Sequence, residues 1–151
     1  MIVEKTTSLF DSDATVFVNT VNCVGVMGKG IALEFKKRFP KNFLAYRDWC
    51  ERGSAAPGTV FDFCNGFAPR FIFNVATKNH WKSPSRLEWV GTGITRIRTL
   101  AIRHGATSIA LQALGCSNGG LHWDEVRPLI VDCFGDSPIR VEVYLPGIIT
   151  E

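Results

Sequence analysis

The chain has 151 residues, 46% of them hydrophobic, and its 17 basic and 14 acidic side chains leave a formal charge of +3 at pH 7. This length suits one domain, because a chain of this size buries roughly 70% of its extended surface on folding. The five cysteines are odd in number, widely spaced and never form a C-x-x-C pair. This pattern argues against both a disulfide framework and a zinc site, and it favours a reducing, intracellular setting.

Neither a signal peptide nor an apolar run of the roughly 20 residues that span a bilayer is visible. We therefore expect a soluble, cytoplasmic protein without a membrane partner. The three histidines stand apart from acidic or cysteine clusters at ligand spacing, so no metal is expected. Residues 76–103 hold six basic side chains and one acidic side chain. This strip could attract a polyanion, or it could be the solvated face of a helix.

Strands and helices alternate along the first half of the chain. A short strand is predicted within residues 1–10, and a buried, β-branched strand over 14–20. Ile31, Phe35 and Phe39 recur at helical spacing, and Pro40 is expected to end that helix. A second helix is predicted over 41–53, ending at a glycine, and a strand pair over 58–65 and 70–77.

The second half continues the alternation. Ser85 and Glu88 have the S-x-x-E form of a capping box, which predicts a helix from Ser85 to Gly105. A buried strand is predicted over 107–114, a helix over 123–134 despite Pro128, and a last strand over 139–146. No linker or repeat interrupts the series. The pattern predicts one α/β domain over residues 1–151, with a mostly parallel sheet covered by helices on both faces.

Two strands run directly into glycine-bearing loops. The first loop, VNTVNCVGVMGKG (18–30), and the second, LGCSNGGLHW (114–123), each contain three glycines. Ligands of open α/β sheets bind at the carboxyl ends of strands, and glycine lets backbone amides approach an anion closely. The pair of loops predicts a pyrophosphate site, although each loop alone could be an ordinary turn. Neither loop has a P-loop or dinucleotide-binding fingerprint.

Three polar residues of the first loop carry separate expectations. Asn19, near the strand end, is expected to hold the loop, as asparagine often does in turns. Asn22 is expected to present its amide to a ribose hydroxyl, since it can both donate and accept. Lys29 is expected at the mouth of the loop, with its side chain toward solvent and no part in catalysis.

Three stretches together resemble a macrodomain, the ADP-ribose-binding fold, and specifically the branch that contains the DarG antitoxin and the terminal ADP-ribose protein glycohydrolase. They are VNTVNCVGVMGKGIALEFKKRFP (18–40), NVATKNHWKSPSRLEWV (74–90) and LQALGCSNGGLHWDEVRPLI (111–130). The resemblance implies a three-layer α/β/α macrodomain with a mixed, mostly parallel central sheet. The length is close to that of the antitoxin's macrodomain alone, which fits a stand-alone form or a piece of a longer protein.

The resemblance implies ADP-ribose as ligand or product, and no cofactor. Its pyrophosphate would lie between the two loops, its distal ribose near Asn22 and its adenosine toward the first strand. The implied substrate-binding residues are Ser8, Leu9, Thr20, Asn22, Gly28, Gly30, Ile31, Leu114, Gly115, Cys116, Ser117, Asn118, Gly119, Gly120 and Leu121. Ser8 stands where most macrodomains have an acidic residue that binds the adenine amine, and Ser117 stands where glycine is usual. Both departures bear on the affinity for free ADP-ribose.

The resemblance also implies a reaction. DarG-like macrodomains remove ADP-ribose that a DarT toxin has attached to thymine in single-stranded DNA, and the position of their catalytic lysine is matched here by Lys78. By composition alone Lys78 would be a surface charge, but an amine with a lowered pKa could attack the anomeric carbon or protonate the departing base. The aspartate of the protein-directed glycohydrolase is matched by Gly119, which favours the DNA-directed reaction.

The aromatic and basic cluster after Lys78 is the predicted DNA-binding side. His80 or Trp81 would stack on a base, while Lys82 and Arg86 would reach phosphates. Trp81 could equally pack under the following helix. Other functions stay open, namely a non-catalytic ADP-ribose-binding module, a hydrolase for ADP-ribosylated protein carboxylates or O-acetyl-ADP-ribose, and an antitoxin that blocks a DarT-like toxin by contact.

Overall fold

A computed structural model describes residues 1–116 and 118–145. Its six strands form one sheet in the order β1-β6-β5-β2-β4-β3. Their bounds are Ile2–Lys5 (β1), Val16–Val21 (β2), Val60–Cys64 (β3), Phe71–Ala76 (β4), Ser108–Gln112 (β5) and Arg140–Tyr144 (β6). All neighbouring strands pair in parallel except β3 and β4, which are antiparallel. The predicted mixed, mostly parallel sheet is therefore confirmed.

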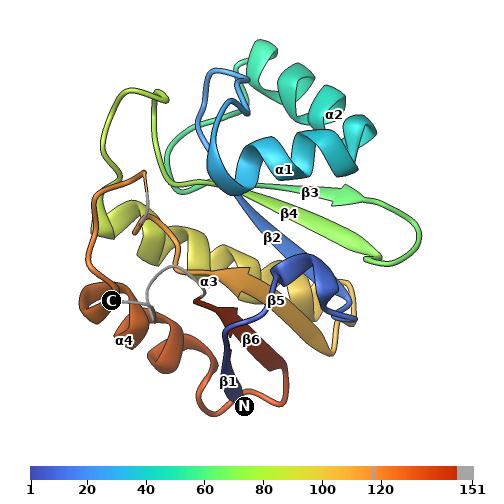
Figure 1. The fold of residues 1–151 in the computed structure, drawn as a ribbon, viewed down its shortest axis with the longest axis vertical. Helices are drawn as coiled ribbons and strands as arrows, with labels where there is room; N and C mark the ends of the chain where they lie inside the picture. The colour runs from blue at the N-terminus through green and yellow to red at the C-terminus, as the bar shows by residue number, and fades with distance from the viewer. Residues whose placement is uncertain (117, 146–151) are drawn as a thin grey trace.

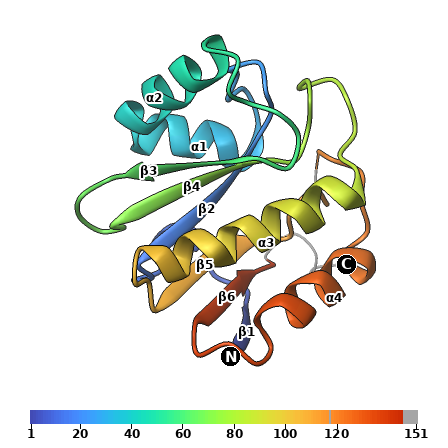
Figure 2. The same ribbon diagram turned by 180° about the vertical axis from the view of Figure 1, so that it is seen from behind.

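Helices cover both faces of this sheet. Helices α1 (Gly30–Arg38) and α2 (Pro40–Glu51) lie on one face, and α3 (Leu87–Arg103) and α4 (Trp123–Phe134) lie on the other (Figures 1 and 2). A single 3₁₀ turn, Leu9–Asp11, follows β1. The arrangement has the three α/β/α layers that the sequence predicts. Among the described residues, no helix combines the length and apolarity that crossing a membrane requires.

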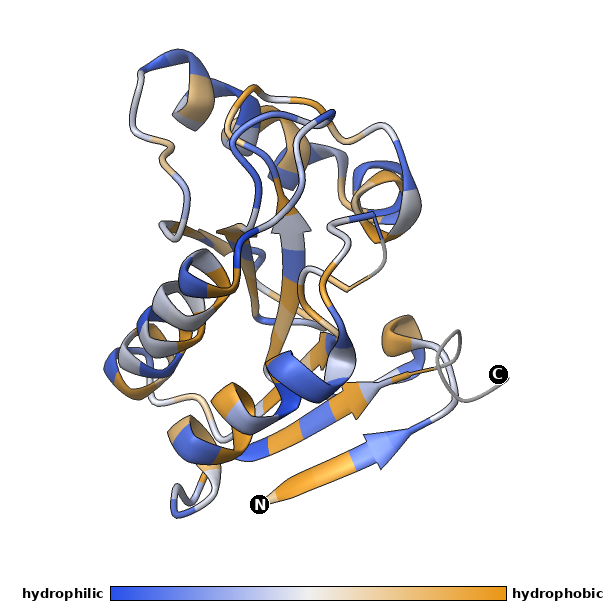
Figure 3. Cartoon of the chain, turned by 90° about the vertical axis from the view of Figure 1, so that its left-hand side faces the viewer, coloured by the Kyte–Doolittle hydropathy of each residue, from blue (hydrophilic) through white to orange (hydrophobic). Residues whose placement is uncertain are grey.

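Residues of β2 alternate between the two halves of the core. Val16 and Val18 belong to the cluster beneath α3 and α4, whereas Phe17 and Val21 belong to the cluster beneath α1 and α2. Successive side chains of a strand point to opposite faces, so a strand covered on both sides is mainly apolar, as β2 is except at Asn19 and Thr20. Figure 3 shows the central strands mainly in hydrophobic colours, while the helices carry hydrophilic residues on one side.

The predicted capping box at Ser85 is wrong. Arg86 is the N-cap of α3, no side chain caps the helix, and the first helical residue is Leu87. The backbone N–H of Ser85 instead donates to the carbonyl of Gly119 at 2.9 Å. A long-range hydrogen bond therefore fixes Ser85 as part of a loop, and the local signal is overridden.

Other predicted boundaries differ by a few residues. Pro40 does not simply end α1, because it is also the first residue of α2, where a missing amide hydrogen costs little. Gly53 and Gly105 follow α2 and α3 with positive φ angles of 75° and 68°, as predicted for helix ends. The last strand ends at Tyr144, and residue 146 of its predicted span lies outside the described residues.

Candidate functional site

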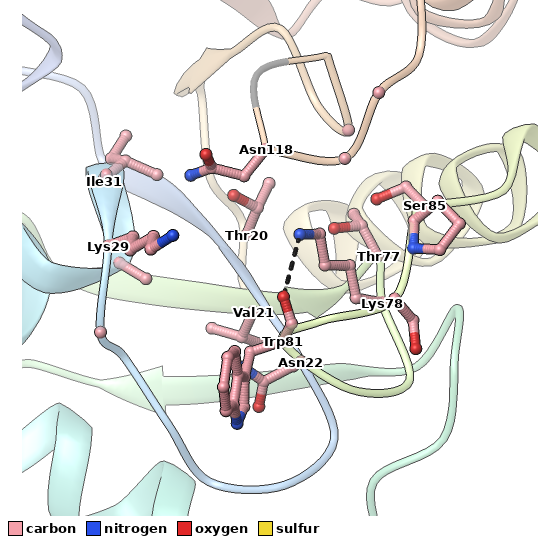
Figure 4. Close-up of a pocket in the computed structure, with 18 of the residues that line it drawn as sticks. Thr20, Val21, Asn22, Lys29, Ile31, Thr77, Lys78, Trp81, Ser85 and Asn118 are labelled. Carbon is pink, nitrogen blue, oxygen red and sulfur yellow. Dashed lines mark hydrogen bonds between the residues drawn. The ribbon is translucent and has the colours of Figure 1, made fainter.

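A cavity of about 750 Å³ opens where β2, β4 and β5 end, and Figure 4 shows the side chains that line it. Strands β2 and β5 are adjacent and parallel, so the loops that follow them meet at one edge of the sheet. Three segments line the cavity: the first glycine loop with the start of α1, the segment 77–85 after β4, and the second glycine loop. The sequence predicted this convergence of the two loops.

The side chain of Asn22 holds the first loop together. Its Oδ1 accepts from the backbone amides of Val24 at 3.0 Å and Val26 at 3.4 Å, and its Nδ2 donates to the carbonyl of Val26 at 2.8 Å. The hydroxyl of Tyr46 on α2 lies 2.8 Å from the Asn22 carbonyl and 2.9 Å from Oδ1. Asn22 is therefore the residue that shapes the loop, a role that the sequence assigned to Asn19.

Asn19 contacts the loop only at Met27, whose Sδ lies 3.8 Å from Asn19 Nδ2, and its other contacts lie in the sheet. It is fully buried, and its Nδ2 donates to Asn74 Oδ1 at 3.1 Å. Asn74 in turn donates to Asn42 Oδ1 on α2 at 2.8 Å. Asn19 thus ties β2 to β4 and, through Asn74, to α2. Asn19 therefore holds the loop through Met27 alone, whereas Asn22 makes several side-chain hydrogen bonds within it.

The two glycine loops approach each other at Gly30 and Asn118. Gly30 has a φ of 56°, and a Cβ at this position would lie 3.1 Å from Asn118 Nδ2. At Gly119 an added Cβ would overlap the carbonyl of Gly115 and Ser85 Oγ. A side chain at position 119, including a carboxylate, therefore has no room unless the loop moves.

The segment 77–85 is attached to both glycine loops. At its start, Thr77 N–H donates to the Val21 carbonyl at 3.1 Å, and Cys23 N–H donates to the Asn79 carbonyl at 3.1 Å. At its end, the hydrogen bond from Ser85 to Gly119 reaches the second loop. The segment is thus a third wall of the cavity, and its position depends on both other walls.

Lys78 lies in this third wall and reaches the cavity. Its Nζ donates to the carbonyl of Trp81 at 3.4 Å (Figure 4). Partial burial lowers the pKa of Lys78 below its ordinary value, and the positive charge of Lys29 lowers it further. A lowered pKa increases the fraction of neutral amine near pH 7, which is the form that can act as a nucleophile.

The expectation that Lys29 lies at the mouth and is open to solvent is confirmed, because Lys29 is exposed. Lys29 also lines the cavity, and Figure 4 shows its amine on the side that faces Lys78. Lys29 is the N-cap residue of α1 in an extended backbone conformation, with φ −145° and ψ 162°. Lys82 lines the cavity too, and no carboxylate is among the described lining residues.

Most of the predicted site residues do line the cavity. Those of the two loops and of β2 that do so are Thr20, Asn22, Gly28, Gly30, Ile31, Gly115, Asn118, Gly119 and Gly120. From the third wall, Lys78, Trp81 and Lys82 join them. The sequence missed Val21, Val26, Lys29, Ala32, Thr77, Ser83, Pro84, Ser85, Gln112 and Ala113. Most of these residues adjoin predicted ones, so extending each predicted loop by one or two residues would have found them.

Several predicted ligand contacts lie outside the lining. Leu9 and Leu114 are buried in the core, so only their backbone is available to a ligand. Cys116 and Leu121 pack against the core cluster beneath α3 and α4, and burial raises the pKa of the Cys116 thiol to about 11. Ser8 caps the 3₁₀ turn by accepting from Phe10 N–H at 3.2 Å. The prediction for Ser117 lies outside the described residues.

The predicted DNA-binding residues divide into two groups. Trp81 is 46% exposed at the cavity, which contradicts packing beneath α3. The His80 ring lies 5.0 Å from the Trp81 ring, and Lys82 Nζ lies 5.0 Å from the centre of the Trp81 ring. Arg86 belongs elsewhere, because it pairs with Glu88 at 3.7 Å and lies over Trp89. His80 and Arg86 do not line the cavity.

Comparison with known proteins places the fold. Residues 18–130 match the family model of the Macro domain. The chain belongs to the macrodomain family. Across residues 1–116 and 118–145 of this macrodomain, no three histidine, cysteine or acidic side chains gather as metal ligands would.

The macrodomain is similar in sequence to curated proteins named DNA ADP-ribosyl glycohydrolase. It is 45% identical to the one from Thermus aquaticus over 146 residues, which cover 92% of this chain and 39% of the relative. It is 40% identical to the one from Mycobacterium tuberculosis, with 97% and 43% covered. The chain therefore spans about two fifths of the length of these relatives.

Solved macrodomains are similar in structure as well. The macrodomain of Thermus aquaticus DarG has 42% identity and a TM-score of 0.91, with 95% of this chain and 97% of that chain covered. The macrodomain of Mycobacterium tuberculosis DarG has 40% identity and a TM-score of 0.92, with 97% of each chain covered. Thermosipho africanus DarTG in complex with ADP-ribose has 30% identity and a TM-score of 0.87, with 93% and 40% covered. The predicted resemblance to the DarG branch is confirmed.

Proposed function

We propose that this macrodomain is an ADP-ribosyl glycohydrolase that removes ADP-ribose from thymine bases of single-stranded DNA, with Lys78 as its catalytic residue. The observation that carries the proposal is the amine of Lys78, with its lowered pKa, in a cavity between two glycine loops. The 42% identity to the Thermus aquaticus DarG macrodomain supports the DNA-linked substrate. The crowding at Gly119 supports a reaction without a carboxylate at that position.

Lys78 can take either of two roles in this reaction. As a neutral amine it attacks the anomeric carbon C1″, the thymine leaves with a proton, and water later releases ADP-ribose from the lysine adduct. As an ammonium ion it gives its proton to the departing base while water attacks C1″. In both roles the base is replaced at C1″ by the oxygen of water. Both need Nζ beside the distal ribose, which the proposed ligand position provides.

The proposed position of ADP-ribose follows from the cavity walls. The diphosphate lies between the two loops, where glycines leave backbone amides accessible and α1 begins. Asn22 Nδ2 donates one of its two hydrogens to Val26, so the second is free to bind a ribose hydroxyl. The adenosine extends toward β1, where Ser8 is the proposed partner of the adenine.

The proposed DNA contact is the exposed cluster at the cavity mouth. Trp81 offers an aromatic surface for an unpaired base, and the adjacent Lys82 offers a charge for a phosphate. His80 supports this surface from beside the Trp81 ring. Arg86 is the weakest member of the predicted set, because Glu88 already pairs with it.

The test uses an oligonucleotide ADP-ribosylated on thymidine. We expect the protein to release ADP-ribose and Lys78→Ala to release none, while Lys37→Ala on the exposed side of α1 retains the wild-type rate. Binding without turnover in the wild type would instead support the non-catalytic module. Faster release from ADP-ribosylated glutamate or from O-acetyl-ADP-ribose would support the other hydrolase activities.

The partner and the compartment are part of the same proposal. A relative that is 30% identical, from Thermosipho africanus, is named as a DNA ADP-ribosyl transferase-DNA ADP-ribosyl glycohydrolase fusion protein. This name supports a DarT-like toxin as the source of the substrate, with both proteins acting on DNA in the cytoplasm. Co-expression with such a toxin tests it: protection that survives Lys78→Ala would favour an antitoxin that acts by contact.

A further inference from the structure

The cavity carries positive charge that no described residue neutralises. Lys29, Lys78 and Lys82 line it, and no acidic side chain is among the described lining residues. Among the described residues, neither Lys29 nor Lys78 takes part in an ion pair. Lys29 and Lys82 are exposed, so solvent screens their repulsion, but all three ammonium groups would attract an anion that enters the cavity.

Lys29 stands where an anion between the loops would lie. It is flanked by Gly28 and Gly30, both of which line the cavity, and it immediately precedes the first residue of α1. The first backbone amides of a helix point outward without intrahelical partners and favour negative charge. A diphosphate at this point would meet those amides and the Lys29 ammonium group together.

Lys29 also faces Lys78 from a different wall of the cavity (Figure 4). We propose that Lys29 is a positioning residue of this site: its ammonium group binds the diphosphate and, across the cavity, opposes the protonation of Lys78. This inference rests on the proposed function, in which Lys78 acts at the distal ribose. The lowered pKa of Lys78, to which the charge of Lys29 contributes after burial, is consistent with it.

Among the described residues around Lys78, Lys29 is the positively charged one that approaches it from another wall of the cavity. Lys82 and His80 belong to the same segment as Lys78, and the His80 Nδ1 accepts from the backbone of Lys82 at 3.1 Å. Cys23 Sγ donates to the Lys78 carbonyl at 3.4 Å, and burial raises the pKa of this thiol to about 11, so it is neutral. The described part of the second loop contributes Asn118 and glycines, which do not titrate.

Ligand binding makes the role of Lys29 more important. The negative charge of a bound diphosphate would favour the ammonium form of Lys78, because an opposite charge nearby raises the pKa of an amine. Lys29 offsets that charge by pairing with the diphosphate. The neutral amine thus stays accessible when the substrate is bound.

The first experiment compares Lys29→Met, which removes the charge, with Lys29→Arg, which keeps it. We expect Lys29→Met to weaken ADP-ribose binding roughly tenfold in calorimetry, the effect of one charge-assisted contact. The pH limb of kcat/KM that reports Lys78 should move to higher pH, whether Lys78 acts as nucleophile or as acid. Lys29→Arg should restore both, and Lys37→Met should change neither. A weakened affinity with an unmoved pH limb would overturn the proposal.

The second experiment is independent of enzymatic activity. Lysine side chains labelled with ¹³C at Cε report their own titration by NMR, and Lys78→Arg identifies the Lys78 signal. We expect the Lys78 titration in free protein to move to higher pH in Lys29→Met and to stay in place in Lys37→Met. An unmoved titration would overturn the proposal even if the protein is a glycohydrolase. If no substrate is hydrolysed, a moved titration would still support the interaction between the two lysines.

Discussion

The two glycine loops form one site but are stabilised in different ways. The first loop is held by polar side chains, since Asn22 binds the backbone of Val24 and Val26 and is itself bound by Tyr46. The second loop is held by close backbone packing, because the Gly119 position leaves no room for a Cβ and its carbonyl accepts from Ser85. The two glycine loops should therefore differ in which substitutions they tolerate.

Asn22→Ala should have the largest effect, because the first loop depends on this one side chain. It removes four hydrogen bonds of the side chain, one of which the Tyr46 hydroxyl shares with the Asn22 carbonyl, and we expect a loss of about 3 kcal/mol in the free energy of unfolding and weaker ADP-ribose binding. Urea unfolding and calorimetry measure the two effects. Asn65→Ala is the matched control, since Asn65 holds the β3–β4 turn through the Phe67 and Pro69 carbonyls. It should lower stability without changing ADP-ribose affinity, and an equal loss of affinity there would contradict the prediction.

Gly119→Ala should come next, and its cost is steric. The added methyl group overlaps the Gly115 carbonyl, and overpacking of this kind costs about 1–3 kcal/mol. Gly120→Ala is the matched control within the same loop. Its φ of 81° is unfavourable for alanine by about 1–2 kcal/mol, but the Cβ meets no atom within 4 Å. We expect ADP-ribose binding to fall more in Gly119→Ala than in Gly120→Ala, and the opposite order would show that packing does not stabilise the loop.

Tyr46→Phe should weaken the first loop from outside the cavity. The buried hydroxyl contributes one hydrogen bond to Asn22, so we expect a loss of about 1 kcal/mol in the free energy of unfolding, measured by urea titration. The proposed reaction at Lys78 should keep its rate at saturating substrate, since Tyr46 does not line the cavity. A kcat that falls in parallel with stability would contradict the prediction that Tyr46 affects the stability of the loop and not the rate of the reaction.

Ser85→Ala should have the smallest effect. Ser85 Oγ is buried and has no hydrogen-bond partner among the described residues, so no bond is lost on its removal. We expect stability to stay unchanged or to rise by up to about 1 kcal/mol, because an unsatisfied buried hydroxyl is unfavourable. A loss above about 1 kcal/mol would show that the hydroxyl has a partner in solution.

Periodicity and the loops at strand ends predicted the layers, the mostly parallel sheet and the meeting of the two glycine loops, and the resemblance to macrodomains added that the sheet is mixed. It failed where a distant residue decides the local structure. Ser85 matches a capping box, but the carbonyl of Gly119 competes for its backbone. Asn22 holds its loop with the help of Tyr46, 24 residues away, which no local pattern reveals. That the exposed Lys29 also lines the cavity depends on how the chain enters α1, and composition carries no information about that.

The segment 77–85 has a mechanical consequence for the site. It joins Val21 and Cys23 near one end and Gly119 at the other, and Lys78 lies between these attachments. A ligand that spreads the two glycine loops apart would pull this segment from both sides. If the proposed diphosphate site is correct, the position of the Lys78 amine therefore depends on whether phosphates occupy the space between the loops, and a ligand fragment that lacks them would leave this amine displaced.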